Sequence, residues 1–318
     1  MEQTRGARRS AGRLAYLAAL AGVGTVALAG LAGCSSSTSG AGAGTVNAIG
    51  TENEYANVLG QIGGRYVHVS SILNNPNTDP HTYESSPSVA QEVSAADLVV
   101  QNGVGYDDFM AKIESASPSS SRKVIVVQHL LGLPDSTPNP HLWYDPTTMP
   151  KVAKAMADAL VALRPAHAAY FQANLRSFDN SLTPWLHAIA AFKARFGGTA
   201  VATTEPVADY LLQAMGLDNR TPFAFQADIM NGTDPPPQDV TLENGFFTGP
   251  TVKVFCYNQQ VTSALTASIR QNAEKAGVPV VGVYETMPTP GYDYQTWMLT
   301  EVHDIEKAIT DGVSTEHL

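Results

Sequence analysis

The chain has 318 residues and a formal net charge of −10, and 44% of its residues are hydrophobic. A domain typically holds roughly 100–200 residues, so this length predicts two domains with packed cores. The acidic balance argues against the nucleic-acid-binding classes, because a surface that binds phosphates needs an excess of basic residues. We therefore expect no nucleic acid among the partners.

Residues 1–33 have the layout of a secretory signal peptide. Arginines, among them Arg8 and Arg9, precede an apolar run at 14–31, and small residues lead up to Cys34. The tetrapeptide L-A-G-C that ends at Cys34 resembles a lipobox, in which the cysteine is diacylated and becomes the new N-terminus. An uncleaved membrane helix is the alternative, since about 18 apolar residues just span a bilayer. The many alanines and glycines favour processing, so we expect an extracytoplasmic lipoprotein anchored to the cell membrane at Cys34. The Arg8-Arg9 pair fits both general and twin-arginine export.

The composition changes sharply after Cys34. Residues 35–44 are only Ser, Thr, Gly and Ala, so they cannot form a core and are expected to be a flexible tether. The other cysteine, Cys256, lies in an apolar run and is expected to be buried as a small hydrophobic residue. The predicted segments are a signal peptide at 1–33, a tether at 34–45, an N-terminal lobe at 46–149, a helical connector at 150–197 and a C-terminal lobe at 198–318.

Short apolar runs alternate with helical patterns in both predicted lobes. This alternation predicts parallel sheets with helices on both faces. The expected strands are 46–49, 66–73, 97–101 and 123–127 in the first lobe, and 200–203, 253–257 and 278–283 in the second. The expected helices are 54–63, 87–95 and 107–115 in the first lobe, and 206–215, 262–276 and 293–310 in the second.

The connector shows no strand pattern. From Phe171 to Phe196 its apolar residues recur alternately four and three positions apart, which is the period of a helix. Pro165 should start this helix, and Pro184 should kink or divide it. The architecture expected from the pattern is therefore two α/β lobes joined by a long helical connector.

Two loops place a proline directly before a histidine. They read D-P-H-T-Y-E at 79–84 and N-P-H-L-W-Y-D-P at 139–146. Each follows a predicted parallel strand, where α/β folds bind ligands. A rigid Pro-His pair suits a metal ligand, but a single such dipeptide says little. The residues alone leave His81 and His141 open between ligands and ordinary histidines, and the other six histidines are expected to be surface or satisfied core residues.

The chain resembles the zinc/manganese-type substrate-binding lipoproteins of ABC metal importers, also called the metal-binding receptor or adhesin lipoprotein family. The matching stretches run in family order from about Val46 to Gly312. They are D-P-H-T-Y-E, A-D-L-V-V-Q-N-G-V-G-Y, N-P-H-L-W-Y-D-P, T-T-E-P-V-A-D-Y-L-L-Q-A-M-G-L, V-F-C-Y-N-Q-Q and V-P-V-V-G-V-Y-E-T. The resemblance implies two Rossmann-like α/β lobes with parallel sheets, a long connecting helix, and a metal site in the cleft between the lobes.

The resemblance also implies a ligand set of His81, His141, Glu205 and Glu285. Glu205, in T-T-E-P, occupies a position that is histidine in typical zinc members and glutamate in many manganese members. Many relatives carry aspartate where this chain has Glu285. Without the resemblance, both glutamates would be interpreted as ordinary loop carboxylates. Imidazoles and carboxylates suit Mn²⁺, Zn²⁺ and Fe²⁺, and the absence of thiolate or Met clusters argues against Cu⁺.

Three further residues are candidates for orienting the imidazoles through their second ring nitrogen, namely Asp145, Glu84 and Tyr83. Helix capping is the alternative role for Asp145. Asn258 and Gln259 follow a predicted strand of the second lobe, where they would either support the ligands by hydrogen bonds or form a plain turn.

The expected function is a binding protein without catalysis. It would capture Mn²⁺ or Zn²⁺ and deliver the ion to an ABC importer permease with its ATPase, and it would be a monomer with no organic cofactor. A metal-dependent hydrolase with the same four ligands is one alternative, but a catalytic zinc site usually keeps a coordination position open for water. A surface adhesin without a transport role is the other.

Overall fold

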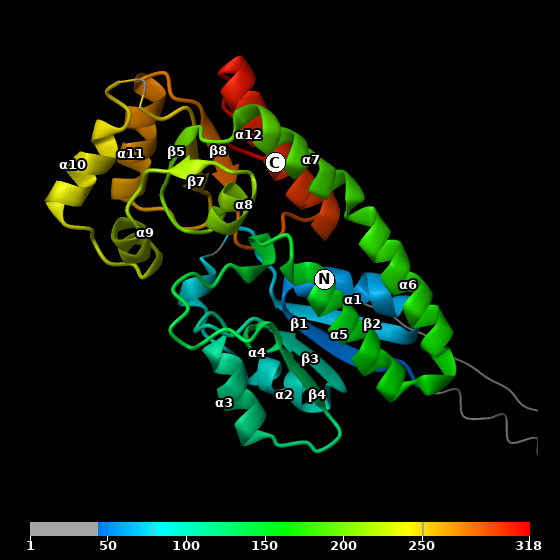
Figure 1. Ribbon diagram of the computed structural model, residues 1–318. Coiled ribbons are helices and arrows are strands. Elements are labelled where there is room, and N and C mark those ends of the chain that lie inside the picture. The colour runs from blue at the N-terminus through cyan, green and yellow to red at the C-terminus, as the bar shows by residue number, and fades with distance from the viewer. Residues whose placement is uncertain (1–43, 78, 250) are drawn as a thin grey trace, which may run out of the picture. The chain divides into compact units, whose positions relative to one another are not determined.

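The computed structural model describes residues 44–77, 79–249 and 251–318, and Figure 1 shows how their helices and strands are arranged. The predicted signal peptide, Cys34 and the tether up to residue 43 lie outside these residues. Within the described ranges, no helix is both long and apolar enough to cross a membrane. The same ranges contain two four-stranded sheets whose strands all pair in parallel. The prediction of two parallel α/β lobes is therefore confirmed.

The first sheet has the strand order β2-β1-β3-β4. Its strands are β1 (Val46–Glu52), β2 (Val67–Leu73), β3 (Leu98–Gln101) and β4 (Lys123–Val126), and its helices are α1 (Asn53–Gly63), α2 (Pro87–Ala95), α3 (Asp108–Ala116) and α4 (Val127–Leu131). The central strand β3 is buried along its whole length. Such a strand reads as a continuous apolar run, which is why the sequence revealed it.

Helix α1 packs on this sheet because its apolar side chains share one side. Tyr55, Val58, Leu59 and Ile62 recur three and four positions apart and are all fully buried. A Cβ on Gly50 of β1 would collide with the backbone of the first turns of α1, so only glycine permits this close approach. The start of α1 is thereby held near the ends of the strands, where α/β folds place their ligands.

The second sheet has the strand order β6-β5-β7-β8. Its strands are β5 (Ala200–Thr203), β6 (Asp218–Asn219), β7 (Phe255–Asn258) and β8 (Val280–Val283), and its helices are α8 (Asp209–Ala214), α9 (Phe223–Met230), α10 (Pro237–Gly245), α11 (Ala264–Lys275) and α12 (Tyr294–Asp311). The sequence did not predict β6, α9 or α10. Cys256 is buried in β7 as expected.

The connector consists of three helices, and the division predicted at Pro184 is confirmed. They are α5 (Thr148–Leu163), α6 (Ala168–Ser181) and α7 (Thr183–Phe196). Pro184 lies in the first turn of α7 and divides it from α6, because a proline is tolerated there but not in a helix interior. In Figure 1, α6 and α7 follow one another in nearly the same direction. Helix α6 packs on α5 and on α1 of the first lobe, and α7 packs on α12 of the second.

Neutral amide side chains on α1 join the two lobes directly. Asn53 donates from Nδ2 to the Met287 carbonyl at 2.8 Å and accepts from the Met287 N–H at 2.8 Å. One turn later, Asn57 accepts from the backbone N–H of Tyr294 at 3.1 Å. The lobes also share one buried apolar cluster that includes Tyr55, Trp143, Trp185 and Trp297.

Candidate metal centre

His81 lies in a 3-10 turn, Pro80–Thr82, in the segment after β2. The preceding proline fixes the start of this turn, and the Asp79 carboxylate accepts a hydrogen bond from the His81 backbone N–H at 2.8 Å. The imidazole therefore projects from a rigid backbone, and its side chain remains 18% exposed. Beside it, a cavity of about 200 Å³ is lined by Asp79 and Pro80 of the first lobe and Thr286 of the second. His81 is thus the ligand candidate that solvent can reach.

His141 is fully buried in the loop between α4 and α5. The side-chain oxygen of Asn139 accepts from the His141 backbone N–H at 3.0 Å and lies 2.8 Å from its Nδ1. The rings of Trp143 and Tyr106 stand edge-on to the imidazole, with centroids 5.5 and 5.8 Å away. These contacts hold the ring so that Nε2 points toward Glu285.

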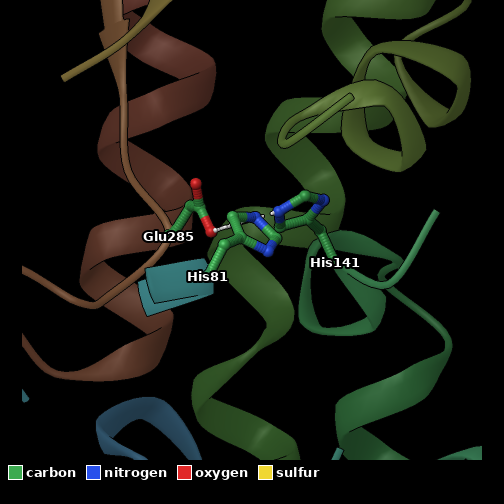
Figure 2. Close-up of side chains that lie close together, drawn as sticks. All are labelled: His81, His141 and Glu285. Carbon is green, nitrogen blue, oxygen red and sulfur yellow. Dashed lines mark ion pairs between the residues drawn. The ribbon is translucent and has the colours of Figure 1, made fainter. Parts of the chain in front are cut away.

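Glu285 follows β8 and brings the second lobe to both histidines (Figure 2). Its Oε2 lies 3.0 Å from His81 Nε2 and 3.4 Å from His141 Nε2. One ligand atom from each of these three residues lies within 4.8 Å of the other two. Residues far apart in the chain are therefore gathered into a single group of metal-ligand type.

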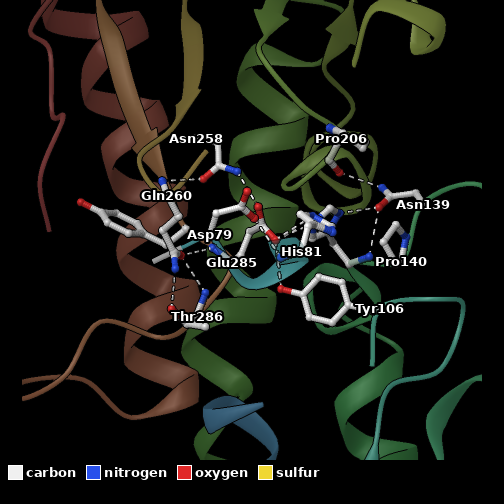
Figure 3. A network of polar contacts seen from close by, with 12 residues as sticks. Asp79, His81, Tyr106, Asn139, Pro140, Pro206, Asn258, Gln260, Glu285 and Thr286 are labelled. Carbon is white, nitrogen blue, oxygen red and sulfur yellow. Dashed lines mark hydrogen bonds and ion pairs between the residues drawn. The ribbon is translucent and has the colours of Figure 1, made fainter. Parts of the chain in front are cut away.

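Hydrogen bonds from both lobes fix the Glu285 carboxylate (Figure 3). Asn258 donates from Nδ2 to Oε1 at 2.6 Å, and the Tyr106 hydroxyl donates to Oε2 at 3.0 Å. The side-chain oxygen of Gln260 accepts from the backbone N–H groups of Glu285 and Thr286 at 2.6 and 2.8 Å. Of the two roles considered for Asn258, the structure has the hydrogen-bonding one.

The charges of this group depend on one another. Burial alone would raise the pKa of Glu285, but His81 and His141 outweigh it and hold that pKa well below its usual range. Burial would lower the pKa of His81, but the Glu285 carboxylate more than reverses this and raises it. For His141 burial prevails, and its pKa is lowered. Its imidazole is therefore neutral at pH 7, as a metal ligand must be.

Glu205 stands two positions after the last residue of β5, Thr203, and is only 2% exposed. It is outside the three-residue group, and within the described residues neither of its carboxylate oxygens has a hydrogen-bond partner. Burial raises the pKa of Glu205 well above its ordinary value, and the negative charge of Glu285 raises it further. A buried carboxylate without a partner is costly, and a cation between Glu205 and Glu285 would remove that cost.

The three candidates for orienting the imidazoles make other contacts. Tyr83 packs against the ring of Phe109 with centroids 5.0 Å apart, and Glu84 is exposed. Asp145 accepts from the backbone N–H of Thr147 at 2.8 Å, just before the start of α5, and α5 has no side-chain cap hydrogen bond.

Sequence reasoning missed two residues that contact the candidate ligands, Tyr106 and Asn139. A signal for Asn139 was present. Asp79 and Asn139 both stand two positions before a histidine, and both accept from that histidine's backbone N–H. No comparable local signal points to Tyr106, which meets Glu285 across 179 positions of chain.

Comparison with known proteins places this chain in a family. Residues 49–308 match the family described as zinc-uptake complex component A, periplasmic, or ZnuA. The chain belongs to this family. The resemblance noted from the sequence motifs is thus confirmed over most of the chain. The ZnuA family consists of substrate-binding transport proteins.

Curated relatives of the ZnuA type align with part of the chain. The metal ABC transporter substrate-binding lipoprotein FimA of Streptococcus parasanguinis is 24% identical over 47% of this chain and 52% of its own length. The manganese-binding lipoprotein MntA of Halalkalibacterium halodurans is 30% identical over 41% of this chain and 45% of its own. The zinc-binding protein TroA of Treponema pallidum is 26% identical over 36% and 39%. The chain thus spans about half the length of the curated relatives it matches, or less.

Solved structures match the fold over a longer range. The periplasmic zinc-binding protein TroA of Treponema pallidum has a TM-score of 0.69 and 18% identity, covering 85% of this chain and all of that one. The Pseudomonas aeruginosa binding protein FpvC, solved with Mn²⁺, has a TM-score of 0.69 and 22% identity over 84% of this chain and 99% of its own. At these identities the similarity establishes the two-lobed fold.

Proposed function

We propose that this ZnuA-family chain captures one divalent transition-metal ion outside the cytoplasm and delivers it to the permease of an ABC importer with its ATPase. His81 and His141 of the first lobe and Glu205 and Glu285 of the second would be the ligands. The observation that carries the proposal is the group formed by His81 with the fully buried His141 and Glu285, whose ligand atoms lie within 4.8 Å of one another. The unpartnered carboxylate of Glu205 supplies the fourth donor.

The charge of this donor set suits a dication. Two neutral imidazoles and two carboxylates give an M²⁺ ion a shell with no net charge, which lowers the cost of burying it. Binding would also separate the like charges of Glu205 and Glu285 by placing the ion between them. The exposed part of the His81 side chain, 18% of its surface, marks the side from which an ion would reach the buried donors.

The proposed cargo is Mn²⁺ or Zn²⁺, and Fe²⁺ suits the same ligands. Glutamates that bind through two oxygens would allow more than four contacts and favour Mn²⁺. By the Irving–Williams order, however, the same site should hold Zn²⁺ more tightly in vitro. The names of the relatives include both a manganese-binding and a zinc-binding protein. Affinity measured in vitro therefore does not identify the cargo, and the metal bound in the native host does.

Elemental analysis of protein purified from its native host without added metal tests the proposal. We expect one equivalent of Mn or Zn per chain, and its loss in His141→Ala and Glu285→Ala variants. His187→Ala, which removes an exposed histidine on α7, is the matched control and should retain the metal. Full metal content in a double variant lacking His81 and His141 would rule out the proposed site.

We also propose that the chain has no catalytic activity. Four protein ligands leave no open position for the activated water that a zinc hydrolase needs. Turnover of ester, phosphoester or peptide substrates by the metal-loaded protein, abolished in His141→Ala, would favour the enzyme instead. A melting curve unshifted by saturating Zn²⁺ and Mn²⁺ would favour an adhesin without transport, since a bound ligand raises stability by mass action.

The proposed location is the outer face of the cell membrane, with a lipid anchor at Cys34 and a monomeric chain. Mass spectrometry of the N-terminal peptide should show a diacylated Cys34. A Cys34→Ala variant should leave the membrane fraction while binding metal as the parent does. Recovery of this variant in the membrane fraction would show that another segment holds the protein there.

A further inference from the structure

Asn139 connects one proposed ligand from each lobe. It is only 6% exposed, and each atom of its amide has a partner. Oδ1 lies 2.8 Å from His141 Nδ1 and 3.0 Å from the His141 backbone nitrogen. Nδ2 donates to the carbonyl of Pro206 at 2.7 Å. Pro206 directly follows Glu205, so a single amide joins the His141 ring to the Glu205 loop, as Figure 3 shows.

The partners of Asn139 determine how its amide is oriented. The Pro206 carbonyl can only accept, so the amide NH₂ must face it, and Oδ1 must face His141. The His141 backbone N–H, which can only donate, requires the same orientation. Because Oδ1 only accepts, the ring nitrogen beside it carries the hydrogen. His141 is therefore the Nδ1–H tautomer, and its Nε2 has a free lone pair.

The other tautomer would be stabilised by Glu285 if Asn139 were absent. Glu285 Oε2 lies 3.4 Å from His141 Nε2 and would accept a hydrogen bond from an Nε2–H group. An imidazole in that state has no lone pair on the side of the proposed ion. Asn139 and Glu285 thus favour opposite tautomers of the same ring, and only the one that Asn139 favours can bind a metal at Nε2.

The second arm of Asn139 acts between the lobes. Its side-chain NH₂ group donates to the Pro206 carbonyl, and the backbone carbonyl of Asn139 accepts from the Tyr210 hydroxyl at 3.0 Å. We propose that Asn139 is a positioning residue that fixes His141 as the Nδ1–H tautomer and ties it to the Glu205 loop. This inference rests on the proposed metal-binding function, but its first half concerns the metal-free protein as well.

Two variants separate the halves of the proposal. Asn139→Ala removes both side-chain contacts, the one with His141 Nδ1 and the one with the Pro206 carbonyl. Asn139→Asp keeps an acceptor for His141 Nδ1–H but cannot donate to Pro206. We expect ¹⁵N NMR of histidine-labelled, metal-free protein to show Nδ1–H at His141 in the parent and in Asn139→Asp, and Nε2–H in Asn139→Ala. Zinc affinity should fall about 10–100-fold in Asn139→Ala, the usual cost of removing a partner of a metal ligand. Asn139→Asp should release zinc to a chelator faster than the parent.

Asn174→Ala is the matched control, because it removes an amide that donates to the Ile62 carbonyl on α1, away from the proposed ligands. It should match the parent in tautomer, zinc affinity and release rate. An Nδ1–H ring in Asn139→Ala, or an Nε2–H ring in Asn139→Asp, would overturn the tautomer role. Zinc release from Asn139→Asp at the parent rate would overturn the proposed role of the hydrogen bond from Asn139 to Pro206. If the parent binds no metal, the proposed function fails, while the tautomer result still decides the role of Asn139.

Discussion

The buried carboxyl of Glu301 should make the stability of this protein fall as the pH rises. Glu301 lies on α12 and is fully buried, and its Oε1 accepts from Trp297 Nε1 at 3.0 Å and from the Tyr144 hydroxyl at 3.3 Å. Burial raises the pKa of Glu301 to about 8. In the unfolded chain its pKa is about 4.3. The carboxyl is therefore neutral in the folded protein at pH 7.

The sign follows from which state holds the proton. Between about pH 4.5 and pH 8 the folded state keeps a proton that the unfolded state has lost, so stability falls with rising pH. One proton corresponds to about 1.4 kcal/mol per pH unit. From pH 5 to pH 8 the parent should lose about 3–4 kcal/mol through this group. Glu301→Gln keeps an acceptor oxygen for Trp297 and Tyr144 but has no proton to lose.

The assay is urea unfolding of metal-free protein at pH 5, 6, 7 and 8. The free energy of unfolding of Glu301→Gln, relative to the parent, should rise by about 3–4 kcal/mol across this range. Glu92→Gln, at an exposed position on α2, is the matched control and should stay parallel to the parent. A constant difference between Glu301→Gln and the parent would refute the reasoning, because it would mean that Glu301 titrates alike in both states.

Three other changes have defined outcomes. Glu205→Gln should stabilise the metal-free protein at pH 8 by on the order of 1–3 kcal/mol, because at this pH the buried Glu205 must either bind a proton or carry an unpaired charge when the chain folds, and glutamine does neither. It should also reduce the rise in melting temperature on adding Zn²⁺; calorimetry with and without Zn²⁺ measures both, and an unstabilised variant that keeps the parent's Zn²⁺ response would contradict the assignment. Asn53→Ala should lower the free energy of unfolding by about 1–3 kcal/mol, since it leaves both Met287 backbone groups unpaired; urea unfolding at parent stability would argue against this contact. Burial raises the pKa of the Cys256 thiol, so iodoacetamide should label this residue only in denaturant. Peptide mapping measures the labelling, and labelled Cys256 in the native protein would contradict this expectation.

Most of the sheet architecture was predictable because buried parallel strands are short apolar runs. What escaped prediction lacked such a pattern. Strand β6 consists of only two residues, Asp218 and Asn219, which pair with β5 at two positions. Helix α10 buries only Glu243 along its length, so no apolar stripe marks it. These elements are held by their neighbours, and local sequence does not carry that information.

The candidate site was predictable to different degrees for its two halves. The Pro-His loops suggested His81 and His141 from local sequence, whereas Glu205 and Glu285 depended on the family resemblance. The residues alone could not single out the glutamates, because burial of a carboxylate is decided by the tertiary fold. The same holds for Tyr106, whose role exists only once Glu285 has been brought to it from the other lobe.

The shared apolar cluster means that the two halves of the chain bury each other's aromatic side chains. The ring of Trp185 on α7 packs edge-on against Tyr294 of α12, at 5.8 Å, and the Tyr294 hydroxyl donates to the Trp143 carbonyl at 2.6 Å. Cutting the chain between its halves would leave large aromatic faces in water on both fragments. Each half therefore depends on the other to keep these aromatic side chains out of water.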